Sequence, residues 1–390
     1  MRIRLLLLMG LVLLPGAVAA APAETTKPKT VDCDAGQTLA GALSKLDKRG
    51  PNTLTVSGTC RENVAIRGFD DLRIEAPGAV LIPASVGLGT SALEVVGSRF
   101  VTIDGLTVHG GDVEAGIRLR SCADCRLTNC LVDGDSVFGI MAFDSSSVTV
   151  SACTLQGAGY AGMGVAASFA VVANAVFDGS QGRWVGIAVS ANGSANVLSS
   201  VLRNHGVGIW AGEGGQISIG DWAAPGPQDS TVTVEGNWCQ GVWVETTSKV
   251  TTVSRVFNRL RVLGNGSDCW GTGVNVDTGG VFYTYSPIEV TDNTSGGIRL
   301  NHHALARLAG GGSVSGNQGP GVAAYTDSMA IGPQAPPWEP SLEVQGNQGN
   351  DLQCDSTSMI TNAARLTGAT NVSCVKLWDE DLEPSSGGGS

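Results

Sequence analysis

Two carboxylates occur at matching points of a repeating pattern in the middle of the chain. Glu245 and Asp277 each lie four residues after a glycine that opens the same short motif, Gly241 and Gly273. Carboxyl groups held about 5 Å apart can share the work of cleaving a glycosidic bond, one as acid and one as base or nucleophile. Their repulsion raises one pKa, so that an acid stands beside a base. We therefore interpret the two as candidate catalytic residues, the alternative being an unreactive ladder of solvated surface charges.

Basic, aromatic and amide residues recur at neighbouring points of the same pattern. Arg299 can bind a uronate carboxylate through two parallel hydrogen bonds, which makes it the third candidate catalytic residue. An outward tryptophan is costly unless something covers it. A stacked sugar ring could cover it, and so could loops of the chain itself. The candidate substrate-binding residues are Trp210, Trp243, Asn275, Asn301 and His302.

Histidine does not suggest a metal site. His302 and His303 follow Asn301 directly, and successive residues of a strand point to opposite sides, so the pair is poorly placed to share a metal ion. We expect one of the two to face a groove, and we interpret the pair as surface residues rather than catalytic ones. His109 and His205 are isolated turn residues with no partner in view.

The elements that position these residues come from a repeat with a period near 23 residues. Its signature is a glycine, an apolar residue, a variable residue and a second apolar residue. Successive glycines lie 22–24 residues apart, except for two longer repeats of 33 and 32 residues, whose extra segments near 212–235 and 246–272 could form the walls of a groove or cover the tryptophans. The signature glycines are Gly116, Gly139, Gly162, Gly186, Gly208, Gly241, Gly273, Gly297 and Gly321.

The alternation within each strand predicts which side chains face outward. The residue after the glycine points inward and the next one points outward. Stacked coils, roughly 4.8 Å apart, then align equivalent residues in columns. One outward column contains Trp210, Trp243, Asn275 and Arg299, and the next contains Glu245, Asp277, Asn301 and Tyr325.

A second signature places an asparagine at a turn before each of several strands. Asparagine tolerates left-handed backbone and bonds neighbouring backbone groups. We expect stacked copies to bond one another in a structural ladder, with sugar contact as the alternative. The ladder residues are Asn237, Asn265, Asn293, Asn317 and Asn347.

These strands and turns resemble the right-handed parallel β-helix superfamily, which includes pectate lyases and polygalacturonases. The resemblance implies an all-β fold, a single right-handed parallel solenoid of roughly 22–24-residue coils over residues 55–375. Asn275-Val276-Asp277 also resembles the Asn-x-Asp motif of polygalacturonases, in which the aspartate is catalytic. The other motifs of that family, a neighbouring Asp-Asp, a later Gly-His-Gly and an Arg-x-Lys, are missing here. Lyases of this fold use arginine or lysine as the base, often with calcium, so calcium is implied only for a lyase.

The ends of the chain carry other signals. A charged start followed by an apolar run predicts a signal peptide over residues 1–20 and hence export to the cell exterior or periplasm. Residues 21–54 form an N-terminal segment and cap, in which Leu39, Leu43 and Leu46 have helical spacing. A helix there would cover the open end of the first coil. We expect residues 376–390 to be a disordered tail.

Ten cysteines in an exported chain indicate disulfides before metal ligands. Cys33 with Cys60 and Cys354 with Cys374 would fasten the two ends, and Cys239 with Cys269 would join neighbouring segments. Cys130 and Cys153 fall in one inward column, within disulfide range. Cys122 and Cys125 form a lone CxxC, and a zinc site built from these last four residues is the alternative.

The net negative charge of the chain limits the kinds of molecule that it is expected to bind. Acidic residues outnumber basic ones by 35 to 24, a net charge of −11, which argues against nucleic acid and anionic membrane surfaces. The partner we expect is a polysaccharide or cell-surface glycan, bound by a monomer without a cofactor. Two functions fit the pattern. One is a polysaccharide hydrolase or lyase, and the other is a non-catalytic glycan-binding or structural β-helix protein.

Overall fold

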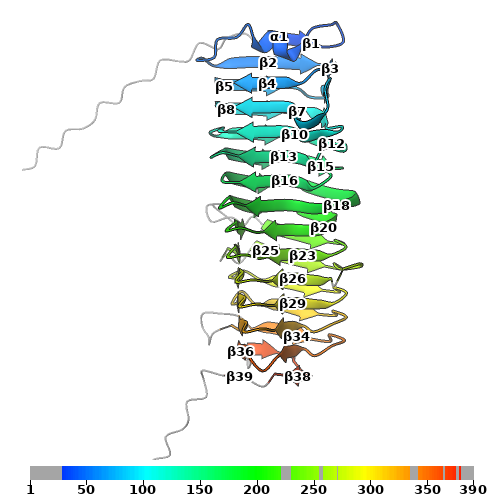
Figure 1. The fold of residues 1–390 in the computed structure, drawn as a ribbon, viewed down its shortest axis with the longest axis vertical. Helices are drawn as coiled ribbons and strands as arrows, with labels where there is room; N and C mark the ends of the chain where they lie inside the picture. The colour runs from blue at the N-terminus through cyan, green and yellow to red at the C-terminus, as the bar shows by residue number, and fades with distance from the viewer. Residues whose placement is uncertain are drawn as a thin grey trace, which may run out of the picture.

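The computed structural model shows a parallel β-solenoid that is elongated along the stacking axis (Figure 1). It describes residues 29–220, 230–253, 258–269, 271–333, 341–362, 365–374 and 377–378. Every strand pair is parallel, so each coil hydrogen-bonds to the coils before and after it, and the all-β solenoid expected from the repeat is confirmed. The expected signal peptide lies outside the described residues.

Three faces run the length of the stack. Face A is a 15-stranded sheet. Its strands are β1 (Lys29–Asp32), β2 (Asn52–Ser57), β5 (Asp70–Glu75), β8 (Arg99–Asp104), β11 (Cys125–Thr128), β14 (Ser147–Ser151), β17 (Phe169–Ala173), β19 (Ser194–Leu198), β21 (Gln216–Ile219), β24 (Lys249–Thr252), β27 (Val281–Thr284), β30 (Leu305–Leu308), β33 (Met329–Ile331), β36 (Met359–Thr361) and β39 (Leu377–Trp378).

The signature glycines lie on face B or directly before it, and the candidate site residues lie on its strands or in the turn that follows them. Its strands are β4 (Val64–Arg67), β7 (Gly87–Val96), β10 (Val113–Arg120), β13 (Phe138–Phe143), β16 (Ala161–Ala166), β18 (Val176–Ser190), β20 (Val201–Ala211), β23 (Gln240–Val244), β26 (Thr272–Val276), β29 (Gly296–Leu300), β32 (Val322–Ala324), β35 (Leu352–Cys354) and β38 (Val372–Ser373).

Face C precedes face B in each coil. Its strands are β3 (Thr59–Arg61), β6 (Val80–Ile82), β9 (Thr107–His109), β12 (Leu131–Asp133), β15 (Thr154–Gln156), β22 (Ser230–Glu235), β25 (Asn258–Leu263), β28 (Ile288–Thr291), β31 (Gly312–Ser315), β34 (Leu342–Gln345) and β37 (Leu366–Thr367). Strands β18 and β20 are long enough to run across both faces, so B and C form one 24-stranded sheet.

The inward positions of face B form the core, as the alternation predicts. The residue after each signature glycine is fully buried, from Ile117 and Ile140 to Ile298 and Val322. The glycines themselves lie where backbones and side chains approach closely. A Cβ at Gly139 would lie 2.6 Å from the carbonyl oxygen of Gly162, and one at Gly208 would lie 2.3 Å from Val234. A side chain at either position would displace the neighbouring coil, which explains the repeating glycine.

The asparagine ladder expected from the sequence is confirmed. The side-chain nitrogen of each asparagine donates to the side-chain oxygen of the next, over 2.8–3.0 Å, and to a backbone carbonyl oxygen or two. The ladder runs along the turn between faces C and B, from Asn237 to Asn347, and ends at the buried carboxylate of Asp351. At its N-terminal end, the backbone nitrogen of His205 donates to Asn237. Buried polar groups that are fully satisfied in this way fix the register of the coils.

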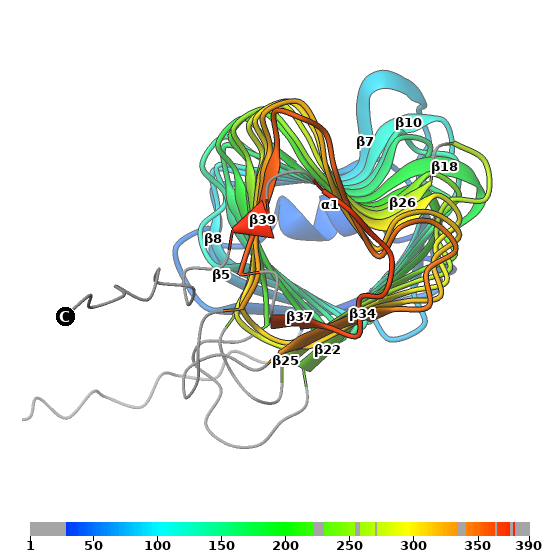
Figure 2. The ribbon, with the colours of Figure 1, turned by 90° about the horizontal axis from the view of Figure 1, so that it is seen from below.

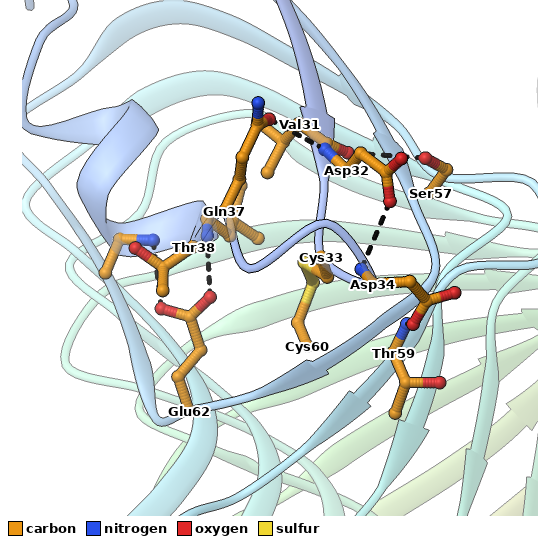
Figure 3. Close-up of a disulfide and its surroundings, with 12 residues drawn as sticks. Val31, Asp32, Cys33, Asp34, Gln37, Thr38, Ser57, Thr59, Cys60 and Glu62 are labelled. Atoms are coloured by element: carbon orange, nitrogen blue, oxygen red, sulfur yellow. Dashed lines mark hydrogen bonds between the residues drawn. A yellow bond between two sulfur atoms is a disulfide. The ribbon is translucent and has the colours of Figure 1, made fainter.

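A short helix covers the N-terminal end of the solenoid, as expected (Figure 1). Helix α1 (Leu39–Leu43) begins after Thr38, whose hydroxyl accepts from the Gly41 nitrogen, and Leu39, Leu43 and Leu46 are buried. Figure 3 shows the Glu62 carboxylate accepting from the backbone nitrogens at the start of α1, beside the Cys33–Cys60 disulfide. Side-chain and covalent bonds together hold the cap on the first coil.

The cysteines and the C-terminal end differ in part from expectation. Disulfides join Cys33 to Cys60, Cys122 to Cys125, Cys239 to Cys269 and Cys354 to Cys374. Cys130 and Cys153 do stack, with the Cys130 nitrogen 3.4 Å from the Cys153 sulfur, but both are free buried thiols and form no disulfide. Because Cys122 and Cys125 are joined to each other, only these two thiols remain of the four that the zinc alternative requires. Leu377–Trp378, placed in the disordered tail by the sequence, form β39 and pair with β36. No helix in the described residues is long and apolar enough to cross a membrane.

Candidate functional site

The site residues occupy successive rungs of face B and of the turn that follows it. Trp210 pairs with Trp243, Trp243 with Asn275, and Asn275 with Arg299, so these four form one column on stacked strands. The parallel backbone pairing continues into the turn after face B. There the backbone nitrogens of four residues donate to the preceding coil, namely Glu245, Asp277, Asn301 and Tyr325. Viewed along the axis, the outline of the solenoid is indented beside β26 (Figure 2). The columns predicted from the repeat thus exist, and they bring the candidate residues onto neighbouring coils.

Glu245 is half-buried and bound by a tryptophan. The Trp210 indole nitrogen donates to Glu245 Oε1 over 3.0 Å. The Trp210 ring reaches this position by folding over Gly212, where a Cβ would lie 2.4 Å from the ring. Burial raises the pKa of Glu245, the Trp210 hydrogen bond lowers it, and the negative charges of Asp277 and Glu213 raise it, with a net upward shift.

Asp277, one coil further on, is held by a different set of donors. Its Oδ1 accepts from the Thr278 backbone nitrogen over 2.8 Å and from the Thr278 hydroxyl over 3.2 Å. The Nδ1 atom of His302 lies 2.6 Å from the same oxygen. The two carboxyl groups therefore differ in environment: Glu245 lies under an indole ring, whereas Asp277 accepts several hydrogen bonds at a turn.

The two histidines lie in a turn and not in a strand. The alternation of side chains along a strand, from which we expected them to point to opposite sides, therefore does not apply to them. Strand β29 ends at Leu300, and His302 and His303 both adopt left-handed backbone, with φ of 51° and 64°. Both side chains are exposed. His302 reaches back to Asp277 in the preceding coil through its Nδ1 atom. This His302–Asp277 contact was not predicted from the sequence. Nor was the contact between His109 and Asp133, which are opposite each other on β9 and β12.

Arg299 is held by uncharged neighbours. Its Nε donates to Asn301 Oδ1 over 3.2 Å, and Asn301 in turn donates to Asn275 Oδ1 over 3.2 Å. The guanidinium lies over the Tyr325 ring, 5.5 Å from its centre. Within the described part of the chain Arg299 pairs with no carboxylate, unlike Arg67, Arg99 and Arg261. No hydrogen bond from its two terminal nitrogens is recorded among the described residues.

The tryptophans lie on a second apolar cluster outside the main core. The cluster consists of Ala161, Val185, Ala188, Val207 and Cys239. Trp210 and Trp243 pack against it and remain half-buried. Three side-chain polar atoms of the neighbouring strands are buried and have no hydrogen-bond partner among the described residues, namely Trp243 Nε1, Gln240 Oε1 and Thr272 Oγ1.

Few of the described residues of the two longer repeats lie near the site. Most of their described residues form β21, β22, β24 and β25, which lie in faces A and C in register with their neighbours. Among their described residues, Gly212 contacts the Trp210 ring, and residues near Cys269 approach the tryptophan cluster, where the disulfide to Cys239 holds them. Residues 221–229 and 254–257 lie outside the described residues.

Calcium does not fit the residues of this site. Calcium takes six to eight oxygen ligands. The site offers the carboxylates of Glu245 and Asp277, and the oxygens named above already accept hydrogen bonds from Trp210, Thr278 and His302. Among the described residues, the one compact group of three metal-ligating side chains is Cys33, Cys60 and Glu62, in which both sulfurs belong to a disulfide.

Sequence reasoning missed three residues near the site. Tyr160 and Glu213 are the first two. Burial raises the pKa of Tyr160 most, and the negative charges of Glu213 and Glu245 raise it further. Tyr325 falls in the second outward column, but its contact with Arg299 was not predicted. An aromatic residue two positions before a signature glycine, as Tyr160 is before Gly162, is the signal that could have identified the first.

Comparisons with known proteins found similar solved structures and one matching family model. The solved structures that resemble the chain include a Siphovirus 9NA tailspike receptor-binding domain, with a TM-score of 0.43 and 10% identity over 94% of this chain and 78% of that one. An alginate lyase from Paenibacillus sp. str. FPU-7 has a TM-score of 0.30 and 12% identity over 90% and 97% of the chains. The catalytic domain of an α-1,3-glucanase in complex with nigerose has a TM-score of 0.29 and 12% identity over 92% and 70%. No curated protein matches the sequence. Residues 62–221 match the family described as "Right handed beta helix region", and the fold is a right-handed parallel β-helix.

Proposed function

We propose that the protein binds an extended, uronate-containing polysaccharide along face B and hydrolyses its glycosidic bonds. The observation that carries the proposal is the pair of carboxyl groups on adjacent coils, Glu245 and Asp277, in contrasting environments. Hydrolysis of this bond requires an acid for the departing oxygen and a base or nucleophile on the other side. A carboxylic acid kept protonated beside a carboxylate satisfies this requirement.

Each group has a defined role in this mechanism. Glu245 donates its proton to the glycosidic oxygen, since burial and neighbouring negative charge favour its protonated form. Asp277 is the base or nucleophile, and Thr278 and His302 fix the position of its Oδ1 atom. Trp210 orients the acid through its indole N–H. The residues thus supply both a proton donor and an acceptor at fixed positions, each directly after a strand of face B.

Arg299 supplies the preference for an acidic sugar. A guanidinium with no carboxylate partner in the described residues matches the planar geometry of a uronate carboxylate. It lies one coil beyond Asp277, so a polymer that follows the axis would present its next sugars to it. Asn275 and Asn301 keep the guanidinium in place and offer amide groups to sugar hydroxyls.

The proposal is tested by a turnover screen of the purified mature protein. Acidic and neutral polysaccharides are offered with calcium or with a chelator, while new reducing ends and ultraviolet-absorbing unsaturated ends are followed in parallel. Hydrolysis predicts reducing ends without unsaturated ends, and no dependence on calcium. Unsaturated ends would instead mean elimination, with Arg299 as the candidate base and no role for the Glu245–Asp277 pair.

Non-catalytic glycan binding is the second candidate function. It is favoured by the fact that each carboxylate already has a partner within the protein, Trp210 for Glu245 and His302 for Asp277, as in a structural ladder. Retained polysaccharide binding without any product, across the whole panel, would support this function over hydrolysis.

A further inference from the structure

An aromatic platform lies on face B, on the N-terminal side of the two carboxyl groups. Phe138 and Tyr160 form an edge-to-face pair with ring centres 5.5 Å apart. Tyr160 comes directly before β16, and its side chain is 39% exposed. Phe138 packs against the outer apolar cluster that also supports Trp210, so the platform and the site share one continuous surface.

The sequence of face B makes room for this platform. The outward column that holds Arg118 and Met141 in earlier coils continues as Gly164 and Ala188. A Cβ at Gly164 would lie 2.9 Å from the Phe138 ring, so only glycine lets the ring lie there. The second outward column is also small and uncharged at this point, with Ala166 and Ser190.

The charges around the platform select against an anionic occupant. Glu213 and Glu245 are close enough to Tyr160 to raise its pKa, an effect that adds to that of burial. A carboxylate-bearing sugar at this place would be repelled by the negative charge of Glu213. An uncharged sugar ring, by contrast, can place its apolar face on an aromatic ring and its hydroxyls toward carboxylates.

We propose that Phe138 and Tyr160 form a subsite for an uncharged sugar ring. This inference rests on the proposed function and specifies its substrate class: a polymer with uncharged residues on the N-terminal side of Glu245 and Asp277 and anionic residues beside Arg299. Coils rise roughly 4.8 Å each, so the three coil steps from β16 to β23 separate Tyr160 from the acid pair by about 14 Å of backbone. The polymer must therefore lie along the axis.

The test measures binding of three oligosaccharides to the Glu245→Gln protein by calorimetry. The probes are hyaluronan fragments, which alternate uronate and uncharged residues, oligogalacturonates, which are wholly anionic, and cello-oligosaccharides, which are uncharged. We expect the alternating probe to bind tightest. Tyr160→Ala should weaken it tenfold or more and should leave oligogalacturonate within twofold. Arg299→Gln should weaken the two anionic probes and leave the uncharged one unaffected.

Two further variants separate the subsite from a general effect on the fold. Phe169→Ala removes an aromatic side chain of similar exposure, 44%, from face A, and should change no affinity. Gly164→Ala keeps Tyr160 but displaces Phe138, and should reproduce the loss seen in Tyr160→Ala. If the Tyr160→Ala protein binds the alternating probe as tightly as its parent does, the subsite is overturned while the proposed function stands. If the parent binds none of the three probes, the proposed function fails, and the subsite with it.

Discussion

The indole nitrogen of Trp210 donates to Glu245 Oε1 over 3.0 Å, from one coil of the solenoid to the next. This hydrogen bond opposes the upward shift that burial and two neighbouring acids give the pKa of Glu245. It also fixes the direction of the carboxyl group. The relationship joins an aromatic residue of one column to an acid of the next, and it makes the pKa of the acid sensitive to a single indole N–H.

Removal of that donor should move the pH dependence of catalysis. In Trp210→Phe the carboxylate loses a stabilising hydrogen bond, so the pKa of Glu245 rises and the protonated acid persists to higher pH. We expect the alkaline limb of the pH–rate profile to shift upward by as much as about one pH unit. Trp243→Phe is the matched control, since its indole nitrogen has no partner in the described residues. An unshifted profile in Trp210→Phe would mean that Glu245 is not the acid.

His302 should position Asp277 while adding little to stability. Its side chain is 60% exposed, so loss of its contact with Asp277 should change the free energy of unfolding by less than about 1 kcal/mol. His302→Ala should nevertheless lower kcat while KM changes little, because Oδ1 of Asp277 loses one of its donors. His303→Ala alters an equally turn-bound, exposed neighbour and serves as the control. Equal kcat in the two variants would remove His302 from the account.

The asparagine ladder should carry much of the stability of the C-terminal half. Asn293 is fully buried and bonds to Asn265, Asn317 and the Val262 carbonyl. Asn293→Ala leaves several buried polar groups unpaired, and should lower the free energy of unfolding by about 2–4 kcal/mol. Chemical denaturation measures this loss. Thr149→Ala, at a half-buried outward position of β14, should stay within about 0.5 kcal/mol. Similar values for both would contradict the ladder's role.

Stability should fall in mild acid because of His205. Burial lowers the pKa of this histidine to about 4 in the folded protein, below the value of 6.5 for an unperturbed histidine. The unfolded chain therefore binds the proton more readily, and stability is lost as pH falls from about 6.5 to about 4. The full loss is about 3 kcal/mol.

The matched variant for this prediction is His205→Asn. His205 is the residue at the N-terminal end of the asparagine ladder, so an asparagine there would continue the series without a titrating group. Unfolding free energies measured at pH 7 and pH 4.5 should differ less for the variant than for the parent. The same pH dependence in both proteins would place its origin elsewhere.

Much of the fold was predictable because the pattern repeats. The signature glycines mark places where coils approach too closely for a side chain, and the apolar residues after them form the core. The length of a coil and the inward or outward direction of its side chains could therefore be predicted from Gly139, Ile140 and their equivalents. The columns of Trp210 and Glu245 followed from the same register. A repeat does not specify what happens at its turns, however. The left-handed backbone of His302 and His303 let His302 reach Asp277.

Other features depend on contacts between unlike coils. Tyr160 lies outside the columns that the signature defines, and its place beside Phe138 depends on the absence of a side chain at Gly164. Cys130 and Cys153 share a column as predicted, but their shared column alone does not decide whether the two sulfurs are joined. Local periodicity therefore predicts the scaffold, whereas the chemistry depends on irregular residues.

The central claim is that Glu245 is the proton donor for glycosidic-bond hydrolysis, and the most direct measurement compares turnover in two glutamine variants. Glu245→Gln is compared with Glu289→Gln, which alters a carboxylate on face C that is paired with Arg261. On a polymer cleaved by the parent protein, we expect Glu245→Gln to lose at least about a hundredfold in kcat while still binding the polymer. The Glu289→Gln protein should match the parent. Undiminished formation of reducing ends by Glu245→Gln would contradict the account.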